Sequence, residues 1–286
     1  MKTNKINLNI DKIEITYYLT HEIIDLLNGE QEIDFNDFKL IRNNEDSNFA
    51  INYDIMIPDY ECDAFYKKFG NIYFGSNRHF KNQIYVSIYN PLLYTYDEKH
   101  YIYAITETIG LEFMEINYIE IAVDTNVNLI SKYGKLMKNE DYTPIILNKK
   151  IKDMNKEITA IKNIYTGTRK NPNKYKSVYF TNKEGGLTLN IYDKKKEIKD
   201  NANTKNYIIN DGEFSKSDKV IRYEIRALNH IIKDTLNKLG YRQEDLYYQL
   251  FNDDFITNIF KDLSDRIIRI EDNKKNVYNL LYLLLD

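Results

Sequence analysis

Several short segments of this 286-residue chain alternate apolar and polar residues, and this alternation limits the folds that the chain can adopt. Successive side chains of a β-strand point to opposite faces, so alternation predicts strands that bury one face. The predicted strands are residues 11–19, 71–74, 83–89, 117–125, 164–168, 177–181, 187–192 and 220–228. The Asn-Lys-Glu-Gly-Gly sequence of residues 182–186 predicts a tight turn between two of them. An antiparallel or mixed sheet therefore accounts for most of the regular structure before residue 229.

Helical periodicity is found in one early segment and throughout the end of the chain. In residues 97–110, Tyr101 and Ile105 lie on one stripe, and Gly110 is a typical helix stop. Residues 152–162 fit either a short helix or a loop. The other segments with helical spacing are residues 231–239, 246–260, 263–270 and 277–285. The expected fold class is α+β: a central antiparallel or mixed sheet with helices on one face, followed by a helical C-terminal region. The expected domains are residues 1–228 and 229–286.

Cysteine and histidine usage excludes several classes of protein. The single Cys62 cannot form an internal disulfide, which excludes secreted disulfide-rich scaffolds and favours a reducing cytoplasm. The four histidines lack metal-ligand spacing; they are His21, His79, His100 and His230. No Gly-rich phosphate-binding motif or Gly-x-Ser-x-Gly motif occurs, and no stretch reaches the roughly 18–20 apolar residues of a membrane span. Nucleotide hydrolysis, serine-type acyl transfer and a membrane location therefore have no support.

The formal net charge of −3 hides two segments of opposite charge. Residues 21–63 contain twelve acidic and two basic residues, a net charge of −10, whereas residues 149–199 contain fourteen basic and five acidic residues, a net charge of +9. This asymmetry predicts an anionic partner near the middle of the chain, although a charged run is also typical of a solvated surface. The 26 tyrosines fit either A/T-rich codon usage or an aromatic surface on which nucleobases stack.

The polar faces of the predicted strands carry most of the candidate functional residues. Taken strand by strand, they are Glu14; Glu120 and Asp124; Thr188, Asn190 and Tyr192; and Arg222, Glu224 and Arg226. If these strands share one sheet, the carboxylates line its open face, and such oxygen ligands without histidine are the environment that Mg²⁺ or Mn²⁺ prefers. A nearby tyrosine is a candidate nucleophile toward a phosphodiester. Alternating charges are equally typical of a solvated sheet face, so the pattern leaves both interpretations open.

Four short motifs follow one another in the second half of the chain. They are Ile119-Glu120-Ile121-Ala122-Val123-Asp124, Ile164-Tyr165-Thr166-Gly167-Thr168-Arg169-Lys170, Leu189-Asn190-Ile191-Tyr192-Asp193-Lys194 and Ile221-Arg222-Tyr223-Glu224-Ile225-Arg226. In this order they resemble the replication initiation factors of rolling-circle plasmids and phages, the trans-acting Rep family. The similarity covers residues 115–228, with a looser match at residues 11–15. The chain departs from the family pattern at Tyr118, where a basic residue is common.

The resemblance implies a protein that nicks one DNA strand, forms a 5′-phosphotyrosine and leaves a 3′-hydroxyl that primes synthesis. It also implies a divalent metal held by carboxylates. Matched by position, the nucleophile is Tyr192, the metal ligands are Asp124 and Glu224, and the phosphate-binding residues are Arg169, Lys170 and Arg222. Tyr179 and Tyr165 remain competing nucleophiles. The strand faces add Glu120 and Glu14 to the metal ligands, and the face and charge patterns add Lys194, Lys195 and Arg226 to the DNA-binding residues.

The leading hypothesis is a rolling-circle replication initiator that acts as a metal-dependent DNA nickase and strand transferase. Its expected cofactor is Mg²⁺ or Mn²⁺, its partner is single-stranded or hairpin origin DNA, and its location is the cytoplasm. A helicase partner and a homodimer are open alternatives. The rival hypotheses are a nucleic-acid-binding protein without catalysis and a phage structural or host-interaction protein. Adduct formation with DNA separates the first hypothesis from the rivals, and salt-dependent DNA binding separates the two rivals.

Overall fold

The computed structural model divides the chain into two compact units. The structure describes residues 6–27, 30–43, 49–59, 65–76, 82–95, 98–127, 141–146, 149–150, 164–166, 177–182, 185–200, 214 and 219–279. Unit 1 comprises Met1–Asn9, Glu120–Arg242 and Asn252–Asp286, and unit 2 comprises Ile10–Ile119 and Gln243–Phe251. The expected domains, residues 1–228 and 229–286, stay a prediction.

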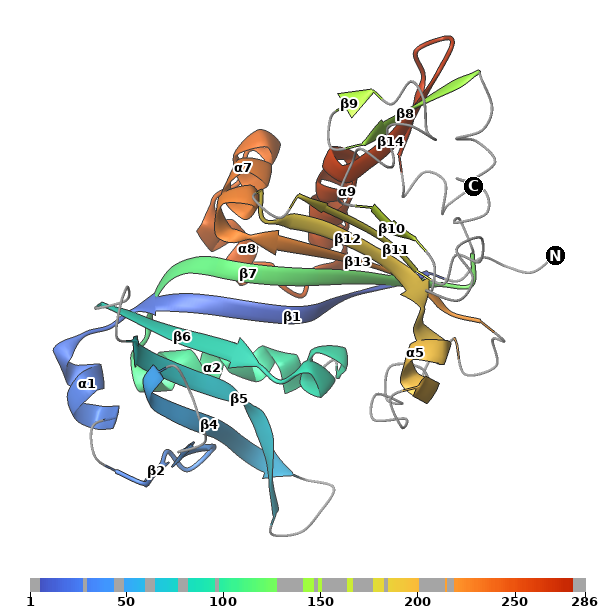
Figure 1. Ribbon diagram of the computed structural model, residues 1–286. Helices are drawn as coiled ribbons and strands as arrows, with labels where there is room; N and C mark the ends of the chain where they lie inside the picture. The colour runs from blue at the N-terminus through green and yellow to red at the C-terminus, as the bar shows by residue number, and fades with distance from the viewer. Residues whose placement is uncertain are drawn as a thin grey trace. The chain divides into compact units, whose positions relative to one another are not determined.

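Unit 2 is built on a sheet with the strand order β7-β1-β6-β5-β4-β3-β2 (Figure 1). The neighbouring strands β1 and β6, β6 and β5, β5 and β4, β4 and β3, and β3 and β2 are antiparallel. Its strands are β1 (Ile6–Tyr18), β2 (Glu32–Asp34), β3 (Lys39–Arg42), β4 (Phe49–Asp59), β5 (Phe65–Ser76), β6 (Gln83–Ile88) and the first part of β7 (Glu112–Thr125). Its helices are α1 (His21–Leu27), η1 (Asn90–Tyr94), η2 (Glu98–His100), α2 (Tyr101–Ile109) and α8 (Gln243–Tyr248). Strands β1 and β7 both continue into unit 1.

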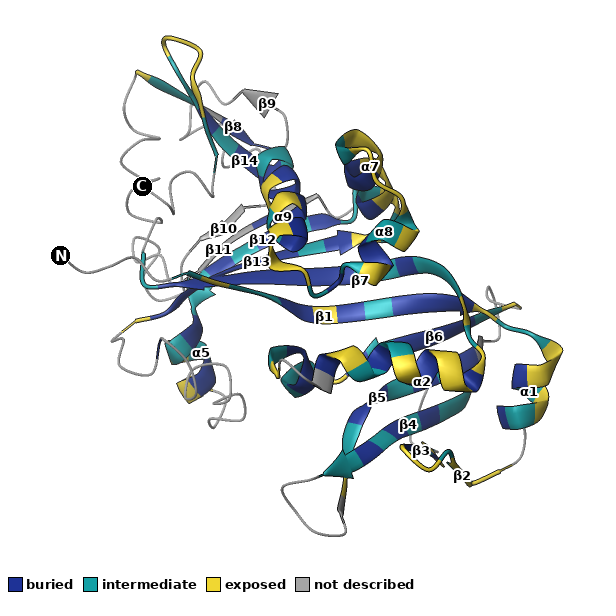
Figure 2. Cartoon of the chain, turned by 180° about the vertical axis from the view of Figure 1, so that it is seen from behind, coloured by how far each residue is buried: buried dark blue, intermediate teal, exposed yellow. Residues whose placement is uncertain are grey.

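The core of unit 2 follows the periodicity of its sequence. In β1, Ile13 and Ile15 are buried on one face, as the alternation predicts. In α2, Ile102 and Ile105 are buried on one stripe, and Figure 2 shows this helix lying along the strands with its exposed residues outward. Gly110 ends α2 with a φ of 79°, a left-handed conformation that costs glycine little.

Unit 1 is built on a sheet with the strand order β10-β11-β12-β13-β7 (Figure 1). Its strands are β10 (Ile164–Thr166), β11 (Ser177–Asn182), β12 (Leu187–Asp193), β13 (Ile221–Leu228) and the second part of β7. The successive pairs from β10 to β13 are antiparallel. Ile221, Tyr223 and Ile225 of β13 are buried on one face, so the predicted strand and its apolar face are both confirmed.

Three helices accompany this sheet: α5 (Lys194–Asp200), α7 (Asn229–Leu239) and α9 (Asp253–Ile267). The longest, α9, contacts β12 and β13, and Figure 2 shows it in front of these strands. Its N-cap residue is Asn252, whose side chain accepts a hydrogen bond from the backbone N–H of Phe255. The prediction of one continuous helix over residues 246–260 is therefore wrong. Helix α8 ends at Tyr248, and the cap at Asn252 starts a new helix.

A second, small sheet has the order β15-β14-β8-β9. Its strands are β8 (Tyr142–Ile146), β9 (Lys149–Lys150), β14 (Ile268–Asp272) and β15 (Val277–Asn279). The helix predicted over residues 263–270 is wrong for residues 268–270, and the helix predicted over residues 277–285 is wrong for Val277–Asn279. These residues pair as strands, and the buried β-branched Ile268 and Ile270 suit a strand as well as a helix stripe.

The α+β fold class predicted from the sequence is confirmed, with antiparallel sheets and with helices concentrated toward the C-terminal part of the chain. Periodicity did not predict α1, the strands β2 to β4, or α5. The expected helix or loop over residues 152–162 lies outside the described residues. Among the residues that the structure describes, none of the helices is both long and apolar enough to cross a membrane.

Candidate active site

The polar faces of β12 and β13 meet in the register that the strand pattern predicts. Tyr192 lies opposite Arg222, and Asn190 lies opposite Glu224. Strand β7, next to β13 on its other side, contributes Glu120. The prediction that this face is open is wrong for Arg222, Glu224 and Glu120, whose side chains are buried, whereas the Arg226 side chain on the same face is 43% exposed. Opposite charges on neighbouring strands pair with one another here, so the face does not depend on water to satisfy them.

Asp124 and Arg222 form a buried, two-pronged ion pair within unit 1. Arg222 Nε donates to Asp124 Oδ1 at 2.8 Å, and its Nη2 donates to Oδ2 at 2.6 Å. The Arg222 side chain is 0% exposed and the Asp124 side chain 3% exposed. Both carboxylate oxygens thus already accept a strong hydrogen bond from a fixed guanidinium. The sequence analysis predicted Asp124 as a metal ligand. In the structure, its carboxylate pairs with the guanidinium of Arg222.

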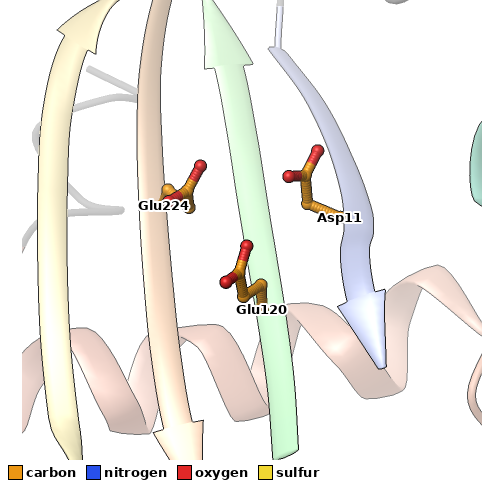
Figure 3. Close-up of side chains that lie close together, drawn as sticks. All are labelled: Asp11, Glu120 and Glu224. Atoms are coloured by element: carbon orange, nitrogen blue, oxygen red, sulfur yellow. The ribbon is translucent and has the colours of Figure 1, made fainter. Parts of the chain in front are cut away.

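Glu120 and Glu224 form a pair of buried carboxylates on β7 and β13, drawn in Figure 3. They offer carboxylate oxygens that lie within 4.8 Å of each other. Arg226 binds both acids: its Nε lies 3.1 Å from Glu120 Oε1, and its Nη2 donates to Glu224 Oε1 at 2.7 Å. The Arg226 side chain is 43% exposed, so this guanidinium reaches the acids from a position that solvent also reaches.

The half-buried Tyr192 contacts this pair of acids directly. Its hydroxyl donates a hydrogen bond to Glu224 Oε2 at 2.9 Å. Glu224 therefore uses one oxygen for the tyrosine and the other for Arg226. The structure brings together four of the sequence-predicted site residues at one place on the sheet of unit 1: Tyr192, Glu224, Glu120 and Arg226.

The predicted DNA-binding lysines differ from one another in burial. The Lys194 side chain is 1% exposed and its Nζ lies 2.9 Å from Glu197 Oε2, whereas Lys195 is only half-buried and Lys196 is exposed. The Lys194 ammonium also lies over the ring of Tyr192, 5.6 Å from its centroid. Lys194 thus already has protein partners, and the DNA-binding roles of Lys194 and Lys195 stay predictions.

Unit 2 holds two further acids of β1. Glu14, a predicted metal ligand, accepts hydrogen bonds from the Tyr73 hydroxyl and the Asn117 amide. Burial, and after it the charge of Glu14, raises the pKa of Tyr73 well above its usual value. Asp11 was not predicted, because strict alternation places it on the apolar face of Ile13, yet it is buried and accepts a hydrogen bond from the Tyr94 hydroxyl. Figure 3 labels Asp11 on its strand.

Two predicted residues, Arg169 and Lys170, lie outside the part of the chain that the structure describes. The two competing tyrosines lie on described strands: Tyr165 of β10 pairs with Tyr179 of β11, and Tyr179 pairs with Asn190 of β12. Their register positions are therefore farther from β13 than Tyr192 is.

Residues 141–245 match the model of a family of phage replication-associated proteins, which describes the N-terminal region of those proteins. This match confirms the resemblance to phage replication proteins over these residues. The matched stretch contains Tyr192, Arg222 and Glu224, whereas Glu120 and Asp124 precede it. A similar solved structure is the rolling circle replication initiator protein from Geobacillus stearothermophilus, with 12% sequence identity, a TM-score of 0.49, and coverage of 93% of this chain and 86% of that chain. A comparison with curated proteins gave no match.

Proposed function

We propose that this chain is a rolling-circle replication initiator that nicks and rejoins single-stranded origin DNA through a tyrosine. The observation that carries the proposal is the hydrogen bond from the Tyr192 hydroxyl to the buried Glu224 carboxylate, at 2.9 Å. A phenol has to lose its proton to attack a phosphodiester, and a carboxylate in contact with the hydroxyl provides the acceptor. The family match over residues 141–245 includes both residues and supports the same activity.

In the nicking step, Tyr192 Oη forms a bond to the phosphorus while the bond from phosphorus to the 3′ oxygen breaks. The phenolic proton passes to Glu224, and the departing 3′ oxygen takes up a proton from water. The products are a 5′-phosphotyrosine and a free 3′-hydroxyl. In the rejoining step the oxygen of a 3′-hydroxyl forms a bond to phosphorus and releases its proton to water, while the bond from phosphorus to Tyr192 Oη breaks. The released phenolate regains a proton from Glu224.

The register of the sheet favours Tyr192 over the two competing tyrosines. Tyr192 lies on β12, the strand directly beside β13 and its Glu224. Tyr179 lies two strands from β13 and Tyr165 three strands away. Neighbouring strands are about 4.8 Å apart, so the backbones of Tyr179 and Tyr165 lie about 10 and 14 Å from β13. Glu224 can therefore assist Tyr192 without any rearrangement of the strands.

A divalent cation, Mg²⁺ or Mn²⁺, fits the donor set of Glu120 and Glu224. The two buried carboxylates offer oxygens within 4.8 Å of each other, and oxygen ligands of this kind would hold a hard cation. When bound, such an ion polarises the phosphoryl oxygens of the substrate. The metal-binding roles of Asp124 and Glu14 stay predictions, because Arg222 binds the first acid and Tyr73 and Asn117 bind the second.

Among the residues that the structure describes, Arg226 is the basic residue best placed to meet DNA at this site. It is the partly exposed cation beside Glu120 and Glu224, and a guanidinium binds a phosphate through two parallel hydrogen bonds. Arg222 holds Asp124 from a fully buried position and acts as a structural partner of the site. A helicase partner, a homodimer and the cytoplasmic location remain part of the proposal.

Incubation of the protein with single-stranded oligonucleotides of randomised sequence and Mn²⁺ tests this proposal. A label at the 3′ end is expected to become covalently attached to the protein, because the 5′-phosphotyrosine retains the 3′ part of the DNA. A label at the 5′ end is expected on a free fragment that a polymerase extends. Salt-dependent binding without any adduct would instead favour a nucleic-acid-binding protein without catalysis.

A further inference from the structure

Arg226 binds the oxygens of Glu120 and Glu224 that the proposed divalent cation would use. Its Nε lies 3.1 Å from Glu120 Oε1 and donates to Glu224 Oε1 at 3.0 Å, and its Nη2 donates to the same Glu224 oxygen at 2.7 Å. The other oxygen of Glu224 accepts the hydrogen bond from the Tyr192 hydroxyl. Both acids of this pair therefore already have a cation of the protein as a partner.

The two acids need a positive partner because they are buried. The Glu120 and Glu224 side chains, on neighbouring strands in Figure 3, are 9% and 4% exposed. Carboxylates that have little contact with water are costly unless a positive group and hydrogen bonds compensate them. The guanidinium of Arg226 provides this compensation, and a divalent cation held by the same oxygens would also provide it. Arg226 and a divalent cation are therefore alternative partners, and each weakens the binding of the other.

Solvent access allows Arg226 to change its partner. Its side chain is 43% exposed, and exposed side chains change rotamer rapidly without a movement of the backbone. The neighbouring pair of Arg222 and Asp124 differs in this respect, because the Arg222 side chain is 0% exposed and holds both oxygens of Asp124. Separating a buried pair of that kind is costly. Arg226 is therefore the arginine of this site that can exchange one anion for another.

We propose that Arg226 couples the binding of DNA to the binding of the divalent cation by exchanging the two acids for a DNA phosphate. The inference rests on the proposed function, because it takes single-stranded DNA as the ligand of this site. A guanidinium binds a phosphate through two parallel hydrogen bonds. When Arg226 moves to a phosphate, Glu120 and Glu224 lose their positive partner and bind the divalent cation more tightly. Because coupling between two ligands is reciprocal, the cation strengthens DNA binding by the same factor.

Calorimetric titration with Mn²⁺, with and without saturating single-stranded oligonucleotides of randomised sequence, tests this coupling. All proteins carry Tyr192→Phe, so that no DNA is cleaved through Tyr192, and a titration of the oligonucleotides alone is subtracted. Without DNA, Arg226→Gln is expected to bind Mn²⁺ about fivefold more tightly than the protein that keeps Arg226. With DNA, the two proteins are expected to bind Mn²⁺ equally, because no guanidinium contacts the acids in either. Mn²⁺ should likewise strengthen DNA binding about fivefold more when Arg226 is present.

Two further variants separate this effect from a general change of charge or structure. Lys199→Gln removes one positive charge from an exposed position on α5, and it is expected to keep the Mn²⁺ affinities of the protein with Arg226, both with and without DNA. Arg226→Lys keeps the charge but lacks the planar fork of a guanidinium, and its Mn²⁺ affinity without DNA is expected to lie between those of Arg226 and Arg226→Gln. A residue that only stabilises the fold would change Mn²⁺ affinity by the same factor with and without DNA.

The outcomes distinguish failure of this inference from failure of the proposed function. If the parent chain forms an adduct but Arg226→Gln changes Mn²⁺ affinity equally with and without DNA, or not at all, only the coupling is refuted. If the coupling is found but the parent chain forms no adduct, the coupling stands and the nicking activity is refuted. If the parent chain binds no single-stranded DNA, both are refuted.

A second variant keeps the test decisive if Arg226→Gln does not fold, as judged by circular dichroism. Arg226→Lys then replaces it in the same titrations. Tighter Mn²⁺ binding than with Arg226 in the absence of DNA, and equal binding in its presence, supports the coupling. Equal Mn²⁺ affinities of the two proteins in the absence of DNA would overturn it.

Discussion

Replacing Asp124 by Asn is expected to destabilise the protein strongly, because Asp124 neutralises a cation that has no access to water. The Arg222 side chain is 0% exposed and donates hydrogen bonds of 2.8 and 2.6 Å to the two oxygens of Asp124. Removing one partner of a buried ion pair leaves the other charge unpaired, which costs about 3–5 kcal/mol of unfolding free energy. At about 2–4 °C per kcal/mol, the melting temperature should fall by roughly 6–20 °C.

Urea and thermal unfolding of the full chain measure this effect. Asp234→Asn is a matched control on an exposed face of α7, and its unfolding free energy should stay within about 0.5 kcal/mol of the parent. The double variant Asp124→Leu with Arg222→Met removes both charges together and is expected to recover most of the loss. If Asp124→Asn is as stable as the control but no longer binds Mn²⁺, Asp124 is a metal ligand and the ion-pair argument is refuted.

Three further predictions concern the surroundings of the site and the packing of the helices. Arg226→Gln removes the guanidinium that pairs with both Glu120 and Glu224, so Mn²⁺ should bind about fivefold more tightly, as measured by calorimetry. Weaker Mn²⁺ binding would contradict a competition between Arg226 and Mn²⁺ for these acids. Lys195→Gln with Lys196→Gln should weaken binding to all single-stranded DNA sequences alike and lower the salt slope by about 2; an unchanged slope removes both lysines from the DNA path. Burial would raise the pKa of Asp262, but the hydrogen bond from Lys238 and the charge of Arg266 outweigh it and lower the pKa of this acid. Because the folded pKa is lowered, the stability it contributes is present at neutral pH and is lost as the pH falls through that pKa. Asp262→Asn should therefore cost about 1–3 kcal/mol at pH 7 and little at low pH, and a cost that persists in acid would refute the ionic contribution.

The strands of the candidate site could be predicted from the sequence because their periodicity is local. The alternation in Ile221 to Arg226 places Arg222 and Glu224 on one face of β13, and the register with β12 bears this out. The position of Tyr192 beside that face followed from the same rule. Local alternation was therefore sufficient to place these residues of β12 and β13 on one face of the sheet.

The partners of these charges could not be predicted, because alternation identifies a face and not the contacts made on it. Nothing in the spacing indicates that Asp124 binds Arg222 or that Arg226 bridges Glu120 and Glu224. These charged groups can be buried because they pair with one another. The sequence did not indicate the pairing, so their burial was not predicted either. Asp11 was missed for a related reason: it breaks the alternation of β1, and a pattern rule treats such a residue as part of the apolar face.

The end of the chain was mispredicted because short isoleucine-rich segments fit two periods. Ile268 and Ile270 continue the helical spacing of α9 but are buried in strand β14 through pairing with β8 and β15. These residues form a strand and not a helix because partner strands are available, and one of these partners, β8, lies far away in the sequence. Local propensity could not supply that information.

The most direct test of the central claim is peptide mapping of the covalent DNA adduct, together with the variant Tyr192→Phe. The substitution removes one oxygen and keeps the ring, so binding to single-stranded DNA and Mn²⁺ should survive while the adduct disappears. The account predicts a DNA-linked peptide that contains Tyr192 in the parent chain and none in the variant. An adduct of normal yield in Tyr192→Phe, or a linked peptide that contains Tyr179 or Tyr165, would contradict it.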